Sequence, residues 1–256
     1  MYCKDLAEEF KQYFEIVYAH NDELMAKVYK IRYDVYCAEL HFEDEENCPN
    51  EEEKDDFDVY SHHFLLKHKP SGNYAGTVRF VIPPHDNPAA LLPFEAFCGD
   101  VFDQSIIDPS ALKRGSFGEV SRLAVPATFK KRAGEQGKPY VIDSPNPNVL
   151  YKGRRFFPYI SVGLYLTCSA LFVLKQLDYT FVMMEPRLAR ALGRNGIKFK
   201  QAGETIDYHG IRAPFYIDQK MLIENMRPDL MDLFEHIKAR VHSEFSLYPE
   251  SFRAAS

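Results

Sequence analysis

Two segments rich in apolar and aromatic residues flank a short polar turn, a pattern typical of a β-hairpin. The two segments are residues 60–67 and 74–82, and Pro70 and Gly72 lie in the turn between them. Residues 179–184 are apolar at nearly every position, which predicts a short strand buried on both faces. Further strands are predicted at 119–125, 199–206 and 212–217.

A helical period of apolar residues runs through the N-terminal part of the chain. One set steps by four, three and four positions, the spacing of one helix face: Leu24, Val28, Ile31 and Val35. Helices are therefore predicted over 4–20 and 22–40, and Asn21 or Asp22 can cap the second one. Further helices are predicted near 94–97, over 159–176, over 187–195 before Gly196, and over 218–245 as one helix or as a pair broken near Pro228.

The order of these elements predicts an α/β (α+β) architecture, in which helices cover the faces of one mixed sheet. A chain of 256 residues can form one large domain or two small ones, and its 46% hydrophobic residues suffice for a substantial core. We expect a single domain over residues 1–256. Within it, residues 126–155 are expected to form an inserted basic loop, and residues 218–256 a C-terminal helical extension.

Composition narrows the class of protein. The formal charge of −6 and the lack of a recognisable binding motif argue against nucleic acid as a partner. Five cysteines without a C-x-x-C pair indicate neither a zinc site nor a disulfide framework. The N-terminal residues do not resemble a signal peptide, so a cytoplasmic location is expected.

An uncharged run over 156–174 approaches the length of a membrane span. It begins near Pro158 and contains Ser161, Thr167 and Ser169, which favour a buried core helix. We therefore expect no stable membrane span, with peripheral contact to a membrane left open.

Three histidines lie in or next to the predicted hairpin: His62, His63 and His68. Adjacent residues of a strand face opposite sides, and no carboxylate at ligand spacing joins these histidines. We therefore predict no metal site and expect these side chains on the surface or in a cleft.

Two segments carry charge of opposite sign. Residues 43–58 hold ten Asp or Glu and one Lys, which is usual for a solvated loop, although residues 54–60 return to an apolar pattern and are expected to be ordered. Residues 126–155 carry a basic excess against only Glu135 and Asp143, which fits either a surface for an anionic partner or an ordinary solvated loop. The basic residues are Lys130, Lys131, Arg132, Lys138, Lys152, Arg154 and Arg155.

The strand over 119–125 has polar residues on its apolar-rich face. Alternation places Glu119, Ser121 and Leu123 on one face and Arg122 on the other. Burying polar groups without partners is costly. Either a reactive cleft or a satisfied internal hydrogen bond accounts for them.

Three local patterns occur along the chain in order, and a late Tyr-His-Gly-x-x-Ala-Pro segment follows at 208–214: Ile31-Arg32-Tyr33-Asp34-Val35-Tyr36 with Phe42, Asp55 and Asp58 with Val78-Arg79-Phe80, and Glu119-Val120-Ser121-Arg122. Together they resemble the acyl-homoserine-lactone synthases and their N-acyl amino acid synthase relatives, a branch of the GNAT acyltransferases. The nearest resemblance is to the acyltransferases associated with PEP-CTERM/exosortase systems. It covers about residues 22–217 and implies a GNAT-like, mostly antiparallel twisted sheet.

The resemblance also implies a set of site residues. Ser121 matches a position that often carries a hydroxyl in that family, and Tyr36 and Phe42 take positions usually held by Phe and Trp. Because the chain has no tryptophan, the Phe42 substitution argues against recognition of the lactone synthases' own amino substrate. The residues that match the shared core of the lactone synthases are Arg32, Asp55, Asp58, Arg79, Glu119 and Arg122.

The expected acyl donor follows from a departure in the glycine loop. CoA-dependent GNAT enzymes carry Arg/Gln-x-x-Gly-x-Gly/Ala after this strand, at a helix N-terminus that holds the pyrophosphate. Residues 132–137, Arg-Ala-Gly-Glu-Gln-Gly, match only approximately. By resemblance the donor is acyl carrier protein with its acyl-phosphopantetheine, rather than acyl-CoA, and the basic residues of 126–155 are its docking surface. No permanently bound cofactor is expected.

The implied reaction transfers a long-chain acyl group to the amine of an amino acid or a related small molecule. Glu119 is the candidate base and Ser121 its aid, whereas Asp55 and Asp58 are candidates to bind the ammonium form of the acceptor. Arg122 is expected to pair with one of these aspartates. Arg32, Arg79 and Arg122 either bind the acceptor carboxylate or pair with the acids in a structural network.

Two other functions stay open at this stage: an acyl-CoA-dependent GNAT acetyltransferase and a GNAT-like module that binds an acyl chain or a partner without turnover. The apolar segments 159–174 and 179–184 fit the wall of an acyl tunnel as well as an ordinary core.

Overall fold

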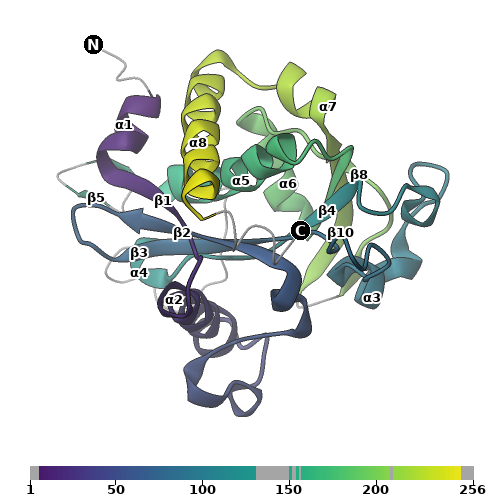
Figure 1. Cartoon of the computed structure of the whole chain (residues 1–256), viewed down its shortest axis with the longest axis horizontal. Coiled ribbons are helices and arrows are strands. Elements are labelled where there is room, and N and C mark those ends of the chain that lie inside the picture. The colour runs from purple at the N-terminus through teal and green to yellow at the C-terminus, as the bar shows by residue number, and fades with distance from the viewer. Residues whose placement is uncertain (1–5, 131–149, 152–153, 156, 208–209, 249–256) are drawn as a thin grey trace.

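The computed structural model describes residues 6–130, 150–151, 154–155, 157–207 and 210–248. An eight-stranded sheet organises these residues in the order β1-β2-β3-β4-β7-β10-β8, and β9 pairs with β10 off this path (Figure 1). Strands β4 and β7 are parallel, whereas the other neighbours along this order are antiparallel. The strands are β1 (Phe14–Tyr18), β2 (Ser61–His68), β3 (Tyr74–Val81), β4 (Phe117–Ala124), β7 (Tyr179–Met184), β8 (Lys200–Gln201), β9 (Ile206–Asp207) and β10 (Ile211–Asp218), with β5 (Leu150–Tyr151) and β6 (Arg154–Arg155) in a separate pair.

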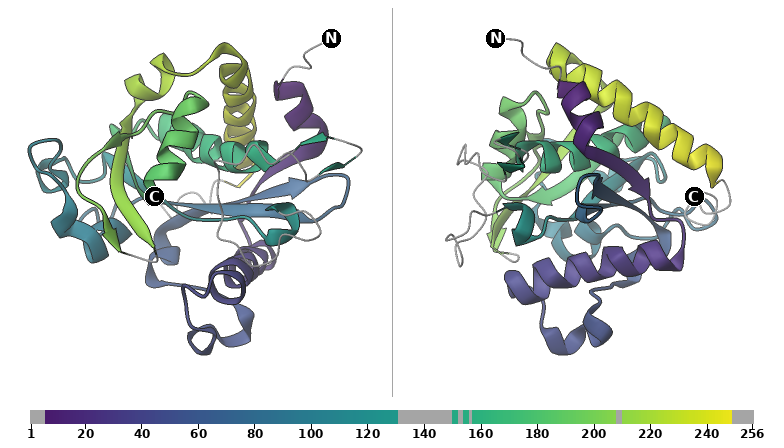
Figure 2. Two further views of the ribbon diagram at one scale, coloured as in Figure 1. Left: turned by 180° about the vertical axis from the view of Figure 1, so that it is seen from behind. Right: turned by 90° about the vertical axis from the view of Figure 1, so that its left-hand side faces the viewer.

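Helices cover both faces of the sheet, which confirms the predicted fold class (Figures 1 and 2). One face carries α1 (Leu6–Tyr13), α5 (Phe157–Leu174) and α8 (Pro228–Leu247). The other carries α2 (Asp22–Tyr33), which continues as a π-helical turn, η1 (Asp34–Glu39). Shorter elements are α3 (Pro93–Cys98), α4 (Ala127–Lys130), α6 (Pro186–Arg194) and α7 (Gln219–Glu224), with 3-10 turns η2 (Glu45–Asn47), η3 (Pro49–Glu51), η4 (Asp56–Tyr60), η5 (Gly99–Val101) and η6 (Pro109–Ala111).

The larger core lies between the sheet and the helices α5 and α8. Leu164 and Leu171 of α5 and Leu233 and Ile237 of α8 are completely buried there. Burial of each such side chain stabilises the fold by about 1.5–3 kcal/mol. Within the described residues, no helix combines the length and the apolar character that crossing a membrane requires.

Most of the predicted elements are confirmed. The hairpin is β2–β3, the run over 179–184 is β7, and the long apolar helix is α5. Asn21 caps α2, because its Oδ1 accepts a hydrogen bond from the Leu24 N–H at 2.9 Å. The C-terminal helices are a pair, α7 and α8, separated just before Pro228.

The helix predicted over 4–20 is wrong in its second half. Helix α1 ends at Tyr13, and the chain continues as β1, which pairs antiparallel with β2. Burial alternates along β1, so Phe14, Ile16 and Tyr18 face the core. The segment is a strand because it pairs with β2, and the local pattern of apolar residues does not reveal this partner strand. The strand predicted over 199–206 is likewise only two short pieces, β8 and β9.

The expectation that the histidines lie on the surface or in a cleft is wrong, because all three are buried. The Tyr18 hydroxyl lies 3.1 Å from His62 Nδ1, and the Ser71 hydroxyl lies 2.8 Å from His68 Nδ1. Burial lowers the pKa of His63 to about 3, so this imidazole is neutral at physiological pH. These histidines therefore belong to the sheet's interior.

Candidate active site

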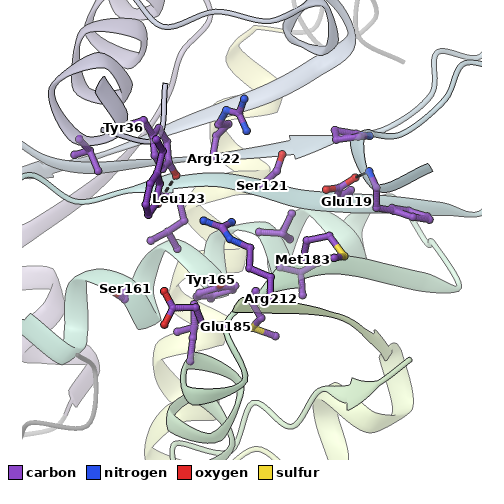
Figure 3. A pocket seen from close by; sticks show the side chains of 18 of the residues that line it. Tyr36, Glu119, Ser121, Arg122, Leu123, Ser161, Tyr165, Met183, Glu185 and Arg212 are labelled. Atoms are coloured by element: carbon purple, nitrogen blue, oxygen red, sulfur yellow. Dashed lines mark hydrogen bonds between the residues drawn. The ribbon is translucent and has the colours of Figure 1, made fainter. Parts of the chain in front are cut away.

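Strands β4 and β7 pair only near their starts, from Phe117 opposite Tyr179 to Glu119 opposite Phe181. Beyond Glu119 the strands separate, and a cavity of about 200 Å³ lies between them (Figure 3). Its walls come from β4 and β7, from η1 and the residues after it, and from α3, α5 and α6. The separation of two parallel strands therefore creates the space for a ligand.

A β-bulge in β4 shapes one wall of this cavity. Arg79 of β3 lies opposite Ser121, but Thr77 lies opposite Ala124, so β4 contains one extra residue. Arg122 accommodates this residue with a φ of 48°, in the left-handed region that side chains other than glycine rarely adopt.

The bulge makes the predicted alternation wrong from Arg122 onward. Ser121 and Arg122 both reach the group formed by Arg79 and Asp55, so these neighbours share the face that α2 covers. Glu119 shares this face, since normal pairing relates it to Ser121. Leu123 turns instead toward the larger core. A period of two cannot reveal the extra residue, because the bulge depends on pairing with β3.

Glu119 is buried in the cavity wall, with 2% of its surface exposed. Its Oε2 accepts a hydrogen bond from the backbone N–H of Phe94 at 2.8 Å, in the first turn of α3. Burial raises the pKa of this carboxyl to about 8, although the Phe94 N–H and the charges of Arg79 and Arg122 oppose the change. A carboxyl with such a pKa can both accept and release a proton near neutral pH.

Ser121 lies in the same wall, two residues along β4. Its Oγ accepts a hydrogen bond from Arg79 Nε at 3.0 Å. Because the oxygen is the acceptor in this bond, the hydroxyl proton can be donated to a molecule in the cavity.

Behind this wall, buried arginines and carboxylates form one connected network. Arg32 is completely buried; its Nη1 lies 2.6 Å from Asp58 Oδ1 and its Nε contacts Glu53. Arg79 is 1% exposed; its Nη1 lies 2.8 Å from Asp58 Oδ1 and also contacts Asp55. The predicted site residues in this network contact one another and do not line the cavity: Arg32, Asp55, Asp58 and Arg79. This arrangement fits a structural ion network rather than a site that binds the acceptor.

Arg122 joins this network from the cavity side. Its Nε lies 3.1 Å from Glu53 Oε1 and its Nη2 lies 3.2 Å from Asp55 Oδ2, so the predicted ion pair with an aspartate is confirmed. Glu43 is a further neighbour, with Oε1 3.7 Å from Nη2. Arg122 lines the cavity, but its charge is already balanced by these carboxylates.

The end of the acidic run is ordered, as predicted. Asp55 Oδ1 accepts from the Phe57 N–H at 3.0 Å, and Asp58 Oδ2 accepts from the Asp55 N–H at 2.9 Å, which caps η4. Burial alone would raise the pKa of Asp58, but Arg32 and Arg79 outweigh it and hold the pKa below its ordinary value.

Two aromatic residues from the predicted site line the cavity on the α2 side. The Tyr36 hydroxyl donates a hydrogen bond to the Leu123 carbonyl at 2.8 Å, and the Arg122 guanidinium lies over the Tyr36 ring at 5.7 Å. Phe42 lies beneath a second guanidinium, that of Arg212, at 5.8 Å.

Sequence reasoning missed Glu53 and Arg212 as site residues. Glu53 is 3% exposed, yet nothing separates it from the other acids of 43–58. Arg212 lies in the late segment 208–214 that carried part of the resemblance, but no local pattern connects it with Phe42. The residues that contact Glu53 and Arg212 lie far from them in the sequence, so only the tertiary structure reveals these contacts.

The apolar part of the cavity wall comes from α5 and β7. Tyr165 of α5 and Val182, Met183 and Met184 of β7 line it, and the same elements contribute to the buried core. Both segments therefore line the cavity as well as the core, and the acyl tunnel stays a prediction. Among the residues that the structure describes, no group of His, Cys, Asp or Glu is arranged to hold a metal ion.

The predicted docking cluster falls where the structure does not describe side chains. Its members Lys131, Arg132, Lys138 and Lys152 lie outside the described residues, and only the backbone is described at Lys130, Arg154 and Arg155.

Comparison with known proteins identifies the fold. Residues 31–137 match the model of the Acetyltransferase (GNAT) domain family. None of the curated protein sequences matches this chain.

Solved structures resemble a much larger part of the chain. The AHL synthase LasI has a TM-score of 0.56 at 12% identity, over 84% of this chain and 95% of its own. FeeM, an N-acyl amino acid synthase from uncultured soil microbes, has a TM-score of 0.51 at 12% identity, over 83% and 94%. BjaI, a CoA-dependent acyl-homoserine lactone synthase with SAM and isopentyl-CoA, has a TM-score of 0.54 at 14% identity, over 90% and 99%. The chain thus has a GNAT-like fold, as predicted.

Proposed function

We propose that this protein is an N-acyltransferase, which moves a long-chain acyl group from an acyl carrier protein thioester to the amine of an amino acid or related small molecule. The observation that carries the proposal is Glu119, a buried carboxyl with a pKa of about 8 in the cavity between the separated strands. LasI and FeeM, whose folds resemble this one, are named as synthases of acylated products. The association with PEP-CTERM/exosortase systems is part of the same proposal.

In the proposed reaction, the neutral amine attacks the thioester carbonyl carbon. A C–N bond forms, the C–S bond breaks, and the amine loses a proton to the Glu119 carboxylate. The pKa of about 8 suits this exchange, because an α-amino group titrates at about 7.7–8.0 and a thiol at about 8.5. Protonated Glu119 can then return the proton to the leaving thiolate, which regenerates the base.

The tetrahedral intermediate needs hydrogen-bond donors for its oxyanion. The β4–β7 ladder ends at Glu119, so the edge of β4 that continues along the cavity wall is not paired with β7 there. Backbone N–H groups of this edge are the proposed donors. Ser121, held by Arg79, is proposed to position a water or to hydrogen-bond the acceptor.

The proposed donor is acyl carrier protein, because residues 132–137 match the glycine pattern of CoA-dependent enzymes only approximately and the segment around them is basic. Acyl-CoA is the alternative donor, and BjaI, of similar fold, is named as CoA-dependent. Mass spectrometry of reactions with each donor and a pool of amino acids tests the proposal and identifies the acceptor. Absence of an acylated amine with every donor, together with intact thioester, would refute it.

The alternative function is a module that binds an acyl chain or a partner without turnover, and a variant of Glu119 distinguishes it from an enzyme. Glu119→Gln removes the base while keeping the shape of the side chain and should abolish product but retain donor binding. Glu204→Gln is the matched control, because Glu204 is exposed and lies outside the cavity lining. Unchanged activity in Glu119→Gln would contradict the catalytic role.

A further inference from the structure

Arg212 lies near the start of β10, the strand that pairs with β7, and its side chain lines the cavity (Figure 3). Its guanidinium carbon lies 5.8 Å from the centre of the Phe42 ring. Its Nε is buried and has no hydrogen-bond partner. A guanidinium with a buried donor that nothing satisfies is costly to keep, unless a ligand completes it.

Three other arginines of this region differ from Arg212 in their partners. Arg32, Arg79 and Arg122 each contact at least two carboxylates of the network. Within the described ranges, no carboxylate lies at ion-pair distance from Arg212. Among the described residues, Arg187 also lines the cavity without an ion pair, but it is exposed to solvent, whereas Arg212 has the buried donor without a partner. Arg212 is therefore the better placed of the two to balance an anion inside the cavity.

Arg212 and Glu119 line the same cavity, together with Ser121 and Cys98. Figure 3 shows the Arg212 side chain inside the cavity, facing the strand that carries Ser121 and Glu119. A small molecule in this cavity can thus contact the guanidinium and the wall that holds the candidate base.

We propose that Arg212 binds the carboxylate of the acceptor, so that the acceptor class is α-amino acids rather than simple amines. This inference rests on the proposed acyl transfer. The planar guanidinium matches a carboxylate through two parallel hydrogen bonds. An α-amino acid carries its amine on the carbon next to the carboxylate, so a carboxylate held by Arg212 directs the amine toward Glu119. An amine without a carboxylate leaves Arg212 unbalanced.

Binding of two product analogues tests this without any need for turnover. N-dodecanoylglycine carries the carboxylate, and N-dodecanoylglycinamide replaces it with a neutral amide of the same size. Isothermal titration should show that the wild-type protein binds the acid about 10- to 100-fold more tightly, the range expected for hydrogen bonds to a charged group. Arg212→Gln should bind both alike, and Arg212→Lys should keep part of the preference. Arg190→Gln, which changes an exposed arginine outside the cavity lining, should keep all of it.

Equal binding of the two analogues by the wild-type protein, binding of neither, or a preference that survives in Arg212→Gln would overturn the proposal. Thermal unfolding of each variant shows whether the fold is kept, and the Arg212→Lys variant supplies the test should Arg212→Gln fail to fold. Kinetics separate this failure from failure of the proposed function. If acyl transfer occurs with the same KM for glycine and glycinamide, only the carboxylate role is lost. If no donor supports transfer, the function fails, and the binding preference is still measured.

Discussion

The carboxyl of Glu119 accepts a hydrogen bond from the backbone N–H of Phe94 at 2.8 Å. This contact joins the last residue of β4 that pairs with β7 to the first turn of α3, and it fixes the carboxyl at the point where the two strands separate. One oxygen is thus held by the protein. Burial supplies the raised pKa, and the cavity supplies access to a substrate.

The rate should depend on pH through Glu119. A base acts in its deprotonated form, and its pKa is raised to about 8, so kcat/KM should rise as pH increases through about 8. Initial rates with a saturating donor measure this profile. In Glu119→Gln the rate should fall by about 100- to 10,000-fold. Its residual profile should follow only the acceptor amine. A wild-type profile that is flat from neutral to alkaline pH would contradict the assignment.

Arg32 should matter for stability more than for chemistry. Replacing it with Met removes one of the two arginines that contact each of the buried carboxylates Glu53 and Asp58. The network then holds an uncompensated buried negative charge, which should cost about 3–5 kcal/mol of unfolding free energy. Lys30→Met is the control, because the ion pair of Lys30 with Asp34 is largely exposed and should contribute at most about 1 kcal/mol. Urea titration measures both variants. Similar losses in the two would argue against the buried network.

The bulge makes a specific prediction for Arg122. Both Arg122→Ala and Arg122→Gly remove the contacts with Glu53 and Asp55. Only the glycine adopts the φ of 48° without strain, so it should be the more stable variant by about 1–2 kcal/mol. At an ordinary strand position alanine would be favoured instead. Denaturant unfolding of the pair distinguishes these outcomes, and a more stable alanine variant would rule out the bulge.

Recognition of acyl carrier protein should depend on salt concentration. If acyl carrier protein docks on the basic residues of 126–155, raising the salt concentration should lower kcat/KM for acyl carrier protein substrates. The double variant Lys130→Glu, Arg154→Glu should also lower kcat/KM for acyl carrier protein substrates. Acyl-CoA of the same chain length is the comparison, and its kcat/KM should respond less to the double variant. Equal responses to both donors would mean that this segment does not recognise the carrier.

Local patterns predicted the parts of the fold that depend on neighbours in sequence. The hairpin around Gly72, the Asn21 cap and the break before Pro228 each follow from residues a few positions apart. The conformation of β1 depends on β2, and the burial of His62 and His63 depends on the whole sheet. These features have tertiary causes and left no local signal.

The candidate site divides in the same way. Glu119 and Ser121 stood out because polar residues on an apolar-rich strand face need an explanation, and both line the cavity. Arg122 was placed on the wrong face, since a bulge is invisible to strict alternation. Arg212 was not assigned a role from the sequence. Its role follows from the ion pairs that the other arginines form and that Arg212 lacks among the described residues, and these pairs are visible only in the folded structure.

The most direct test of the central claim is product analysis of the wild-type protein beside Glu119→Gln and Glu204→Gln. Each is incubated with acyl carrier protein thioesters, acyl-CoA and a mixture of amino acids, and acylated products are measured by mass spectrometry. We predict an N-acyl amino acid from the wild-type and Glu204→Gln proteins and almost none from Glu119→Gln, which should still bind the donor. Equal product from all three, or none from the wild type with any donor, would contradict the proposed function.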